Sequence, residues 1–217
     1  MVPSWTSRIA HDPTAGRGAA RGAHRLPPVL RHASLLDSLL ELQILDRVPR
    51  SGWALRGVPE PESVSEHAFH VVLLVWALAA EVPGLDGARA AELAIVHDLA
   101  EVRLGDLPRT AARYLPDGAK HAAEEAAIAE LLAPLGDRAV ALYREYRGKQ
   151  TREARFVAAC DKLQLMIKVT LYESWGAGGL GEFWDNPENF PDDEFAPVSA
   201  LVADLKERRA PGRRSST

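Results

Sequence analysis

Ionisable side chains interrupt the apolar faces of three predicted helices in this sequence. His67 lies on a face whose apolar members recur at spacings of three and four residues. His97, Asp98 and Glu101 fall within a sector of about 100° at the end of a second apolar segment. Asp161 shares its face of a third helix with valine and leucine. Because such faces turn toward a core, we expect two imidazoles, His67 and His97, and two carboxylates, Asp98 and Asp161, to converge on one interior.

The rest of the chain also shows helical spacing, and we find no convincing strand-like alternation of apolar and polar residues. A first helix is predicted from about His32, and Ser63 with Glu66 forms a capping box at the start of the second. Glu124 and Glu125 are expected on a solvated helix face. The second and later predicted helices cover about 64–81, 86–104, 119–135, 137–147, 151–175 and 197–208, and the loops cover 50–61 and 107–116. The predicted fold class is therefore all-α, a compact multi-helix bundle.

Length and composition favour one folded domain with a basic extension at each end. The chain has 217 residues, of which 47% are hydrophobic and 26% charged, as in ordinary globular proteins. Residues 1–28 carry four arginines and few large apolar side chains, so we expect a disordered basic extension. Residues 206–217 are predicted to form a disordered basic tail. The folded domain is predicted over residues 29–205.

Charge and composition argue against several classes of partner. The formal net charge is −4, and because both ends are basic the folded part is acidic, which disfavours a nucleic-acid partner. No apolar run reaches the roughly 18 residues of a membrane helix, so no membrane partner is expected. Cys160 is the single cysteine and cannot form an internal disulfide, and no signal-peptide core follows the first residues. We therefore expect a cytoplasmic protein.

The inward-facing carboxylates need a cationic partner, because an unpaired buried carboxylate costs several kcal/mol. A salt bridge with arginine or lysine is one solution at any single position. Lys162 adjoins Asp161, but at helical geometry its side chain leaves by another face. One divalent ion would neutralise the whole set, and ligation by imidazole and carboxylate suits Mn, Fe, Co, Ni or Zn. The residues alone leave a metal ion and a structural polar cluster as the two hypotheses.

Segments around these residues resemble the HD-domain metal-dependent phosphohydrolases. His67, then the adjacent His97 and Asp98, then Asp161 follow the order of that family's metal ligands. The neighbouring segments are similar to its 5′-deoxynucleotidase branch: RVPRSGW (47–53), PESVSEH (61–67), HDLAEVRLGD (97–106) and EARFVAACDKL (153–163). The similarity covers residues of about 34–190 and leaves both ends of the chain unaccounted for. It implies an HD-domain bundle.

The resemblance implies a single divalent metal ion, Mn, Co, Fe, Ni or Zn, held by His67, His97, Asp98 and Asp161. Glu101, one turn after His97, matches the carboxylate that positions or deprotonates the attacking water. Asp106 matches a second catalytic carboxylate, with a role as proton donor to the leaving 5′ oxygen. The implied activity is hydrolysis of (deoxy)nucleoside 5′-monophosphates to nucleoside and phosphate.

The match is looser at the residues expected to bind substrate. Arg50 precedes Trp53 in a loop, as an arginine precedes a tryptophan in the family, where the arginine contacts phosphate. Trp53 would then lie near the sugar. Ser51 and Gly52 separate the two residues here, so Arg56 is a second candidate for the phosphate contact. A guanidinium at either position suits phosphate recognition.

Other activities are alternatives to this interpretation. Dinuclear HD enzymes add histidines between the His-Asp pair and the last aspartate, but this chain has only His121 between Asp98 and Asp161, which disfavours them. A nucleoside triphosphate or alarmone hydrolase shares the mononuclear ligand series. A non-catalytic nucleotide-binding module is disfavoured, because every predicted ligand and catalytic carboxylate is present. The resemblance also implies a nucleotide substrate and a homodimer.

Overall fold

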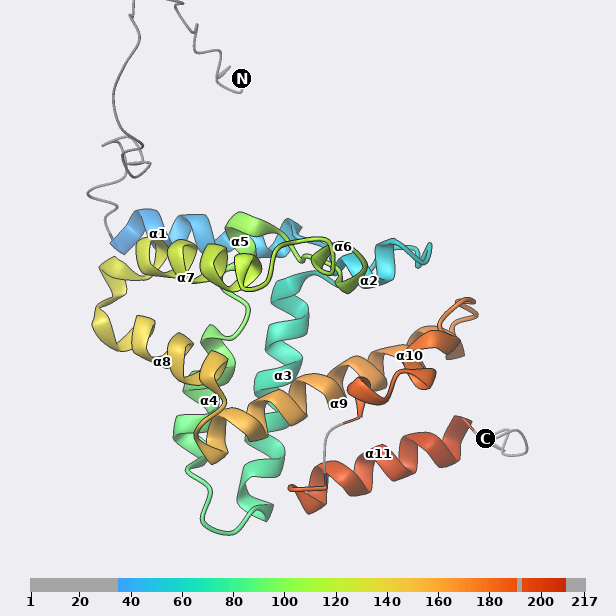
Figure 1. The fold of residues 1–217 in the computed structure, drawn as a ribbon. Helices are drawn as coiled ribbons and strands as arrows, with labels where there is room; N and C mark the ends of the chain where they lie inside the picture. Colours follow the sequence, from blue (N-terminus) through green and yellow to red (C-terminus); the bar gives the residue numbers. More distant parts are fainter. Residues whose placement is uncertain (1–34, 191–192, 210–217) are drawn as a thin grey trace, which may run out of the picture. The chain divides into compact units, whose positions relative to one another are not determined.

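The computed structural model describes residues 35–190 and 193–209, and the secondary structure of these residues is helical (Figure 1). The α-helices are α1 (Leu35–Leu42), α2 (Ser51–Ala54), α3 (Val64–Leu78), α4 (Gly87–Val96), α5 (Glu101–Leu104), α6 (Arg109–Ala112), α7 (Ala119–Leu131), α8 (Asp137–Gly148), α9 (Arg152–Ser174), α10 (Gly181–Asp185) and α11 (Ala196–Arg209). Short 3₁₀ turns are η2 (Gln43–Arg47), η3 (Ala79–Glu81), η4 (Ala133–Leu135) and η5 (Pro187–Asn189). Within the described residues no strand forms, which confirms the all-α prediction.

Two long helices begin where their predicted caps place them. At the start of α3 the Ser63 N–H donates to Glu66 Oε2 at 2.7 Å, and the Glu66 N–H donates to Ser63 Oγ at 3.2 Å. At the start of α9 the Ala154 N–H donates to Thr151 Oγ1 at 3.3 Å. These bonds satisfy amide groups that a helix leaves without internal partners. The sequence therefore sets the start of both helices that carry predicted ligands.

The prediction of one continuous helix over 86–104 is wrong. Helix α4 ends at Val96 and α5 begins at Glu101, and a tighter turn lies between them. His97 Nδ1 lies 2.7 Å from the carbonyl oxygen of Ala94, so the imidazole binds a backbone acceptor that a continuing α-helix would use. The backbone N–H of Leu99 then donates three residues back, to Val96 O, at 3.4 Å. This break sets the direction of the side chains that follow it.

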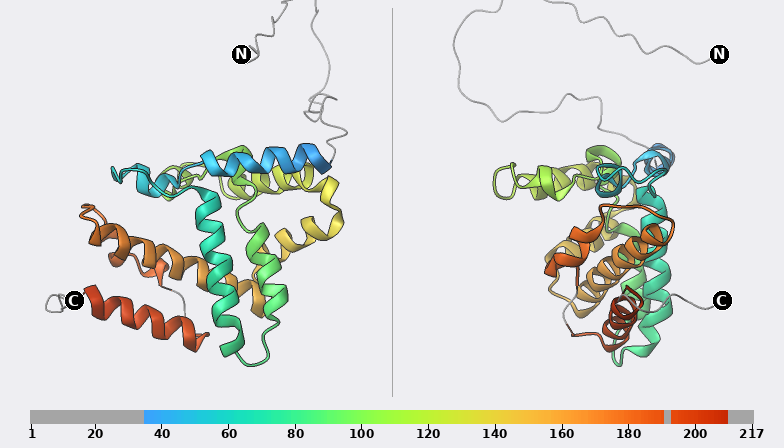
Figure 2. Two further views of the ribbon diagram at one scale, coloured as in Figure 1. Left: turned by 180° about the vertical axis from the view of Figure 1, so that it is seen from behind. Right: turned by 90° about the vertical axis from the view of Figure 1, so that its right-hand side faces the viewer.

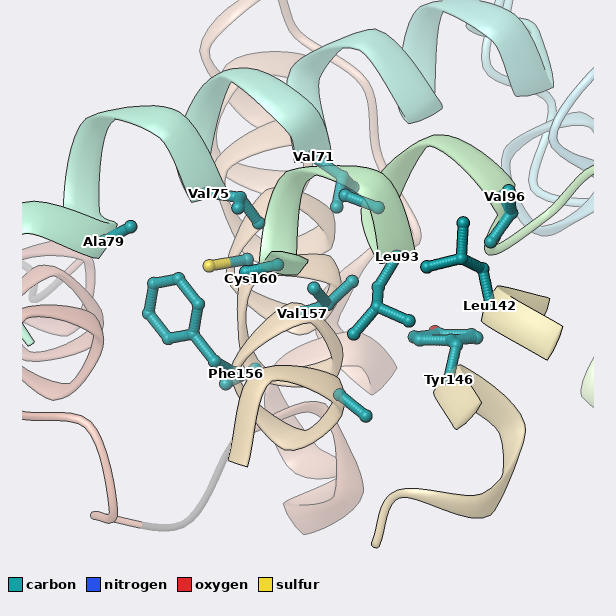
Figure 3. Packing of buried hydrophobic residues seen from close by; sticks show 14 of the residues in the cluster. Val71, Val75, Ala79, Leu93, Val96, Leu142, Tyr146, Phe156, Val157 and Cys160 are labelled. Atoms are coloured by element: carbon teal, nitrogen blue, oxygen red, sulfur yellow. The ribbon is translucent and has the colours of Figure 1, made fainter. Parts of the chain in front are cut away.

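The main core lies between α3, α4 and α9, and α8 and α11 pack against it (Figures 1 and 2). Val75 of α3, Leu93 of α4 and Val157 of α9 are fully buried. Figure 3 shows these side chains meeting beside Phe156 and Tyr146. Because the apolar faces of all three helices meet here, the polar residues on those faces are carried into the same region.

The segment Val64–Glu81 has a mean hydropathy of 1.3 over 18 residues, enough in length and composition to cross a membrane. The segment contains Glu66, His67 and His70, so its uninterrupted apolar run is shorter than 18 residues. Val71 and Val75 on this segment pack in the main core, and such core helices satisfy the same criterion. One such helix is weak evidence for a membrane span.

The last helix agrees with the predicted range 197–208 to within one residue at each end, and it includes residues 206–209 of the predicted basic tail. Helix α11 continues to Arg209, whereas the basic tail was expected from residue 206. Val198 and Val202 on this helix are buried against the core, and the charged residues 206–209 form its last turn. The predicted extension over 1–28 and the remainder of the predicted tail lie outside the described residues.

Leu93→Ala is expected to lower the free energy of unfolding by about 2–5 kcal/mol, because it leaves a cavity in the main core. Ile95→Ala is the matched control on the same helix, since Ile95 is 56% exposed. We expect the control to change stability by less than about 1 kcal/mol. Urea unfolding followed by circular dichroism compares the two, and equal losses would contradict this description of the core.

Candidate metal centre

Two buried imidazoles face each other at the centre of the site. His67 Nδ1 lies 2.7 Å from the side-chain oxygen of Gln164, and His97 Nδ1 lies 2.7 Å from the carbonyl oxygen of Ala94. Both partners accept hydrogen bonds, so each Nδ1 carries the proton and each Nε2 of a neutral ring holds a lone pair. The two Nε2 atoms are 3.3 Å apart. Two lone pairs at this separation repel unless a cation lies with them.

Carboxylates surround the facing nitrogens. Asp98 Oδ2 lies 3.2 Å from His97 Nε2 and 3.5 Å from His67 Nε2. One ligand atom from each of His67, His97 and Asp98 lies within 4.8 Å of the others. Asp161 Oδ1 lies 3.2 Å from His67 Nε2 and comes from α9. Helices α3 and α9 and the break after α4 therefore bring the four predicted metal ligands together.

The electrostatics of this cluster favour a cation. Burial lowers the pKa of His97, but the charge and the hydrogen bond of Asp98 outweigh burial and raise it to about 9. Burial raises the pKa of Asp98, but His97 and Arg50 outweigh it and hold the pKa well below its usual range. The cluster holds a proton strongly when no other cation is bound. A divalent ion fits the same place, because mixed imidazole and carboxylate donors suit Mn, Fe, Co, Ni or Zn.

Arg50 brings a guanidinium group to the centre. Its Nη1 lies 2.9 Å from Asp106 Oδ1, 3.4 Å from Asp98 Oδ2 and 4.0 Å from Glu101 Oε2. The isolated bridge between Pro49 and Ser63 holds its backbone beside the start of α3. The Arg50 N–H also donates to Glu62 O at 2.9 Å. This pairing fixes the Arg50 backbone beside the start of α3, from which its guanidinium reaches Asp98 and Asp106.

Glu101 has an unusually high pKa and a buried oxygen atom without a hydrogen-bond partner. Its Oε2 is buried, has no hydrogen-bond partner and lies 4.0 Å from Arg50 Nη1. Burial and the charges of Asp98 and Asp106 raise the pKa of Glu101 to about 10. A carboxyl group that is buried, lacks a partner and lies beside a metal centre is suited to proton transfer.

Asp106 holds the arginine loop in place. Gly105, with φ 70°, ends α5 and turns the chain so that Asp106 meets the start of α2. The Ser51 N–H donates to Asp106 Oδ2 at 2.6 Å, and Arg50 donates to Oδ1 at 2.9 Å. Both carboxylate oxygens of Asp106 therefore accept hydrogen bonds from the Arg50–Ser51 segment. These contacts hold Arg50 beside the centre, and the predicted role of Asp106 as a proton donor stays a prediction.

Trp53 and Arg56 lie farther from the facing imidazoles. Trp53 is 1% exposed, and its indole N–H donates to Glu62 Oε1 at 3.0 Å. Arg56 pairs with Glu182, donates to Gly52 O at 2.7 Å and lies over the ring of Phe183 at 4.6 Å. Between the two candidate arginines, the structure therefore places Arg50 at the centre and Arg56 away from it.

A cavity of about 780 Å³ opens over the centre. Its lining includes Arg50, His97, Asp98, Glu101, Asp106 and Asp161. Cationic side chains also line it, among them Lys120, Arg147, Lys149 and Lys162. This volume is within the range of roughly 300–1,000 Å³ that ligand pockets occupy. The cavity has the size and the charge for a small anionic molecule.

Glu124 also lines the cavity, contrary to the predicted solvated face. It is 6% exposed, and Tyr143 OH lies 3.4 Å from its Oε2. Arg147 Nη2 lies 3.1 Å from the carboxylate and Lys120 Nζ lies 3.5 Å from it. The prediction is wrong because α8 packs against α7 and covers Glu124. Helical spacing alone gives no sign of this contact.

Comparison with known proteins agrees with the geometry. The HD domain family matches residues 42–184, a range that contains every residue of the centre from Arg50 to Asp161. This chain belongs to the HD domain family. The four predicted ligands, His67, His97, Asp98 and Asp161, all lie within the matched range.

Several relatives of this HD domain carry the same description. The human protein 5′-deoxynucleotidase HDDC2 is 33% identical over 186 residues, which are 82% of this chain and 87% of the relative. The fission yeast 5′-deoxynucleotidase hdd1 is 31% identical over 148 residues, 64% of this chain and 73% of the relative. A solved structure of a conserved hypothetical protein from Pyrococcus furiosus superposes with a TM-score of 0.71 at 33% identity, covering 79% of this chain and 99% of that one.

His97→Ala is expected to abolish metal retention, because it removes one of the two facing nitrogens and leaves Asp98 without its neighbour at 3.2 Å. The measurement is metal content by mass spectrometry after loading with zinc and dialysis. His121→Ala is the matched control, since His121 is exposed on α7. Retention of zinc at the wild-type level by His97→Ala would contradict the proposed ligand set.

Proposed function

We propose that this protein is a metal-dependent phosphomonoesterase that hydrolyses (deoxy)nucleoside 5′-monophosphates to nucleoside and phosphate. The observation that carries the proposal is the pair of Nε2 atoms 3.3 Å apart, beside Asp98 and at the wall of a cavity. Relatives whose similarity covers about 80% of this chain are named 5′-deoxynucleotidases. The proposed ligands of one divalent ion are His67, His97, Asp98 and Asp161.

A divalent ion held by these residues supplies Lewis-acid polarisation of the phosphoryl group and a nucleophilic water at neutral pH. Arg50 lies at the same cavity wall, where its guanidinium binds the phosphate oxygens and offsets their charge. The charge of that ion would lower the raised pKa of Glu101, so that its carboxylate could accept the proton of the attacking water at Oε2, the oxygen without a hydrogen-bond partner. The same carboxyl group then returns a proton to the leaving 5′ oxygen.

The remaining polar groups hold this arrangement. Asp106 keeps Arg50 beside Asp98 and Glu101 through its bonds to Arg50 and Ser51. Because the indole N–H of Trp53 is already bonded, this residue contributes only its packing surface to the nucleoside part of the cavity. Arg56, paired with Glu182, closes the outer part of the same wall.

The oligomeric state and the location are further parts of the proposal. We infer a homodimer, as the resemblance implies, and a cytoplasmic location for it. Exposed apolar residues on α3, Phe69, Leu73 and Trp76, support self-association because they recur at helical spacing on one face. Light scattering coupled to size exclusion measures the mass, and a monomer at micromolar concentration would overturn this part.

Phosphate release tests the activity directly. Metal-stripped protein is supplied separately with Mn, Co, Fe, Ni, Zn or Mg and with deoxy- and ribonucleoside mono-, di- and triphosphates. We expect release from monophosphates with at least one of the transition metals. Release of pyrophosphate or triphosphate alone would instead support the nucleoside triphosphate or alarmone hydrolase alternative.

Glu101→Gln is expected to lower turnover about 10²- to 10⁴-fold, because the amide cannot transfer the proton of the attacking water. Metal content is expected to stay at the wild-type level. Glu125→Gln is the matched control, since Glu125 lies on α7 and pairs with Arg144. Phosphate release and metal analysis are measured on the same samples, and unchanged turnover in Glu101→Gln would remove this residue from the mechanism.

Arg50→Ala is expected to lower kcat/KM for a nucleoside monophosphate about 10²- to 10³-fold, by loss of a donor to the phosphate oxygens. Arg56→Ala removes the same group from the outer wall, where Glu182 already pairs with it, so its loss is expected to be at least tenfold smaller. Steady-state kinetics compare the two. A larger loss in Arg56→Ala would assign the phosphate contact to that residue.

A further inference from the structure

A buried polar chain leads from Glu62 to the metal centre. Glu62 is 4% exposed, Gln164 is 3% exposed and His67 is fully buried. Gln164 Nε2 donates to Glu62 Oε2 at 3.0 Å, and the Gln164 side-chain oxygen lies 2.7 Å from His67 Nδ1. Glu62 precedes α3 and Gln164 lies on α9. These hydrogen bonds therefore join the two helices that supply His67 and Asp161.

Both carboxylate oxygens of Glu62 are contacted by donor groups. Trp53 Nε1 donates to its Oε1 at 3.0 Å, and Lys168 Nζ lies 2.9 Å from its Oε2. The Glu62 backbone is fixed as well, because its N–H donates to Tyr172 OH at 2.8 Å. An ionised carboxylate can accept hydrogen bonds but cannot donate one. The group that Gln164 turns toward Glu62 is therefore its NH₂.

The orientation of the Gln164 amide determines which nitrogen of the His67 ring carries the proton. With its NH₂ bonded to Glu62, Gln164 presents its oxygen to His67 and can only accept there. His67 Nδ1 must donate, so the lone pair of His67 is on Nε2, the atom 3.2 Å from Asp161 and 3.3 Å from His97 Nε2. The reverse orientation of the amide would put the proton on Nε2 and block it as a ligand.

The two imidazoles differ in this respect. His97 Nδ1 is bonded to the backbone carbonyl of Ala94, which cannot exchange a donor for an acceptor. His67 Nδ1 is bonded to a side-chain amide. The accepting oxygen and the donating NH₂ of this amide have nearly the same shape, so a rotation of the group exchanges them. A residue that fixes the direction of the amide is therefore needed at His67 but not at His97.

We propose that Glu62 and Gln164 are positioning residues that fix the tautomer of His67 with its lone pair on Nε2, ready for a metal ion. The inference rests on the proposed metal centre and names residues that act through His67 without touching the ion. Lys168 supports the same arrangement, because its Nζ lies 2.9 Å from Oε2 of the buried Glu62 carboxylate.

Glu62→Gln tests the proposal with almost no change of shape. The new amide can donate to Gln164, which frees the Gln164 amide to reverse. We expect nitrogen-15 spectra of the metal-free variant to move His67 from the Nδ1–H form toward the Nε2–H form. Zinc affinity, measured by competition with a chromophoric chelator, is expected to fall about 10- to 100-fold.

The exchanged pair Glu62→Gln with Gln164→Glu provides the rescue. In this double variant residue 62 can donate to the carboxylate at 164, and that carboxylate can only accept from His67 Nδ1. We expect the Nδ1–H form and most of the zinc affinity to return. A general packing defect would not be repaired by the second substitution, so zinc affinity as low as in the single variant would overturn the proposal.

Glu66→Gln is the matched control, because Glu66 belongs to the capping box of α3 and bonds to Ser63. We expect it to lower the unfolding midpoint but to keep the His67 tautomer and the zinc affinity. Wild-type tautomer and affinity in Glu62→Gln, or an equal loss in Glu66→Gln, would overturn the proposal. These readouts use metal-free protein and zinc alone, so they are independent of whether the wild type releases phosphate from nucleotides.

Discussion

The site depends on one close contact inside the protein, the approach of two imidazole Nε2 atoms to 3.3 Å. Each ring is committed to this direction because its Nδ1 is already bonded to an acceptor. Such a pair is stable only with a positive charge between or beside the rings, and the carboxylates of Asp98 and Asp161 strengthen the demand. A divalent ion meets this demand, and the rest of the site follows from where it would lie.

The helices provide this contact through local breaks and ties more than through regular geometry. The turn between α4 and α5 begins where His97 takes the carbonyl of Ala94, and it turns Asp98 and Glu101 toward the cavity. The bridge between Pro49 and Ser63 brings Arg50 against the same carboxylates. The core of α3, α4 and α9 lies beneath and resists displacement of these parts (Figure 3).

Charge balance explains how acidic and basic groups coexist in one cavity. Glu101 is poorly matched, with a buried oxygen that lacks a partner and a pKa raised to about 10. Asp106, a few residues later, is fully matched by Arg50 and Ser51. Carboxylates so close in sequence thus receive different chemistry from their surroundings, which is how one site can hold both a proton-transfer group and a structural anchor.

Local patterns in the sequence were enough to predict the helical class, the starts of α3 and α9, and the inward direction of His67 and Asp161. Capping and helical spacing act within one or two turns, so these features need no knowledge of the partner helix. The motif order added the family and the ligand set.

Tertiary packing determined four features that join distant segments. They are the end of α4 at Val96, the position of Arg50 rather than Arg56 beside Asp98, the burial of Glu124 and the hydrogen bond from Gln164 to Glu62. These contacts join residues far apart in the chain, and their free energy depends on which groups the folded core excludes from water.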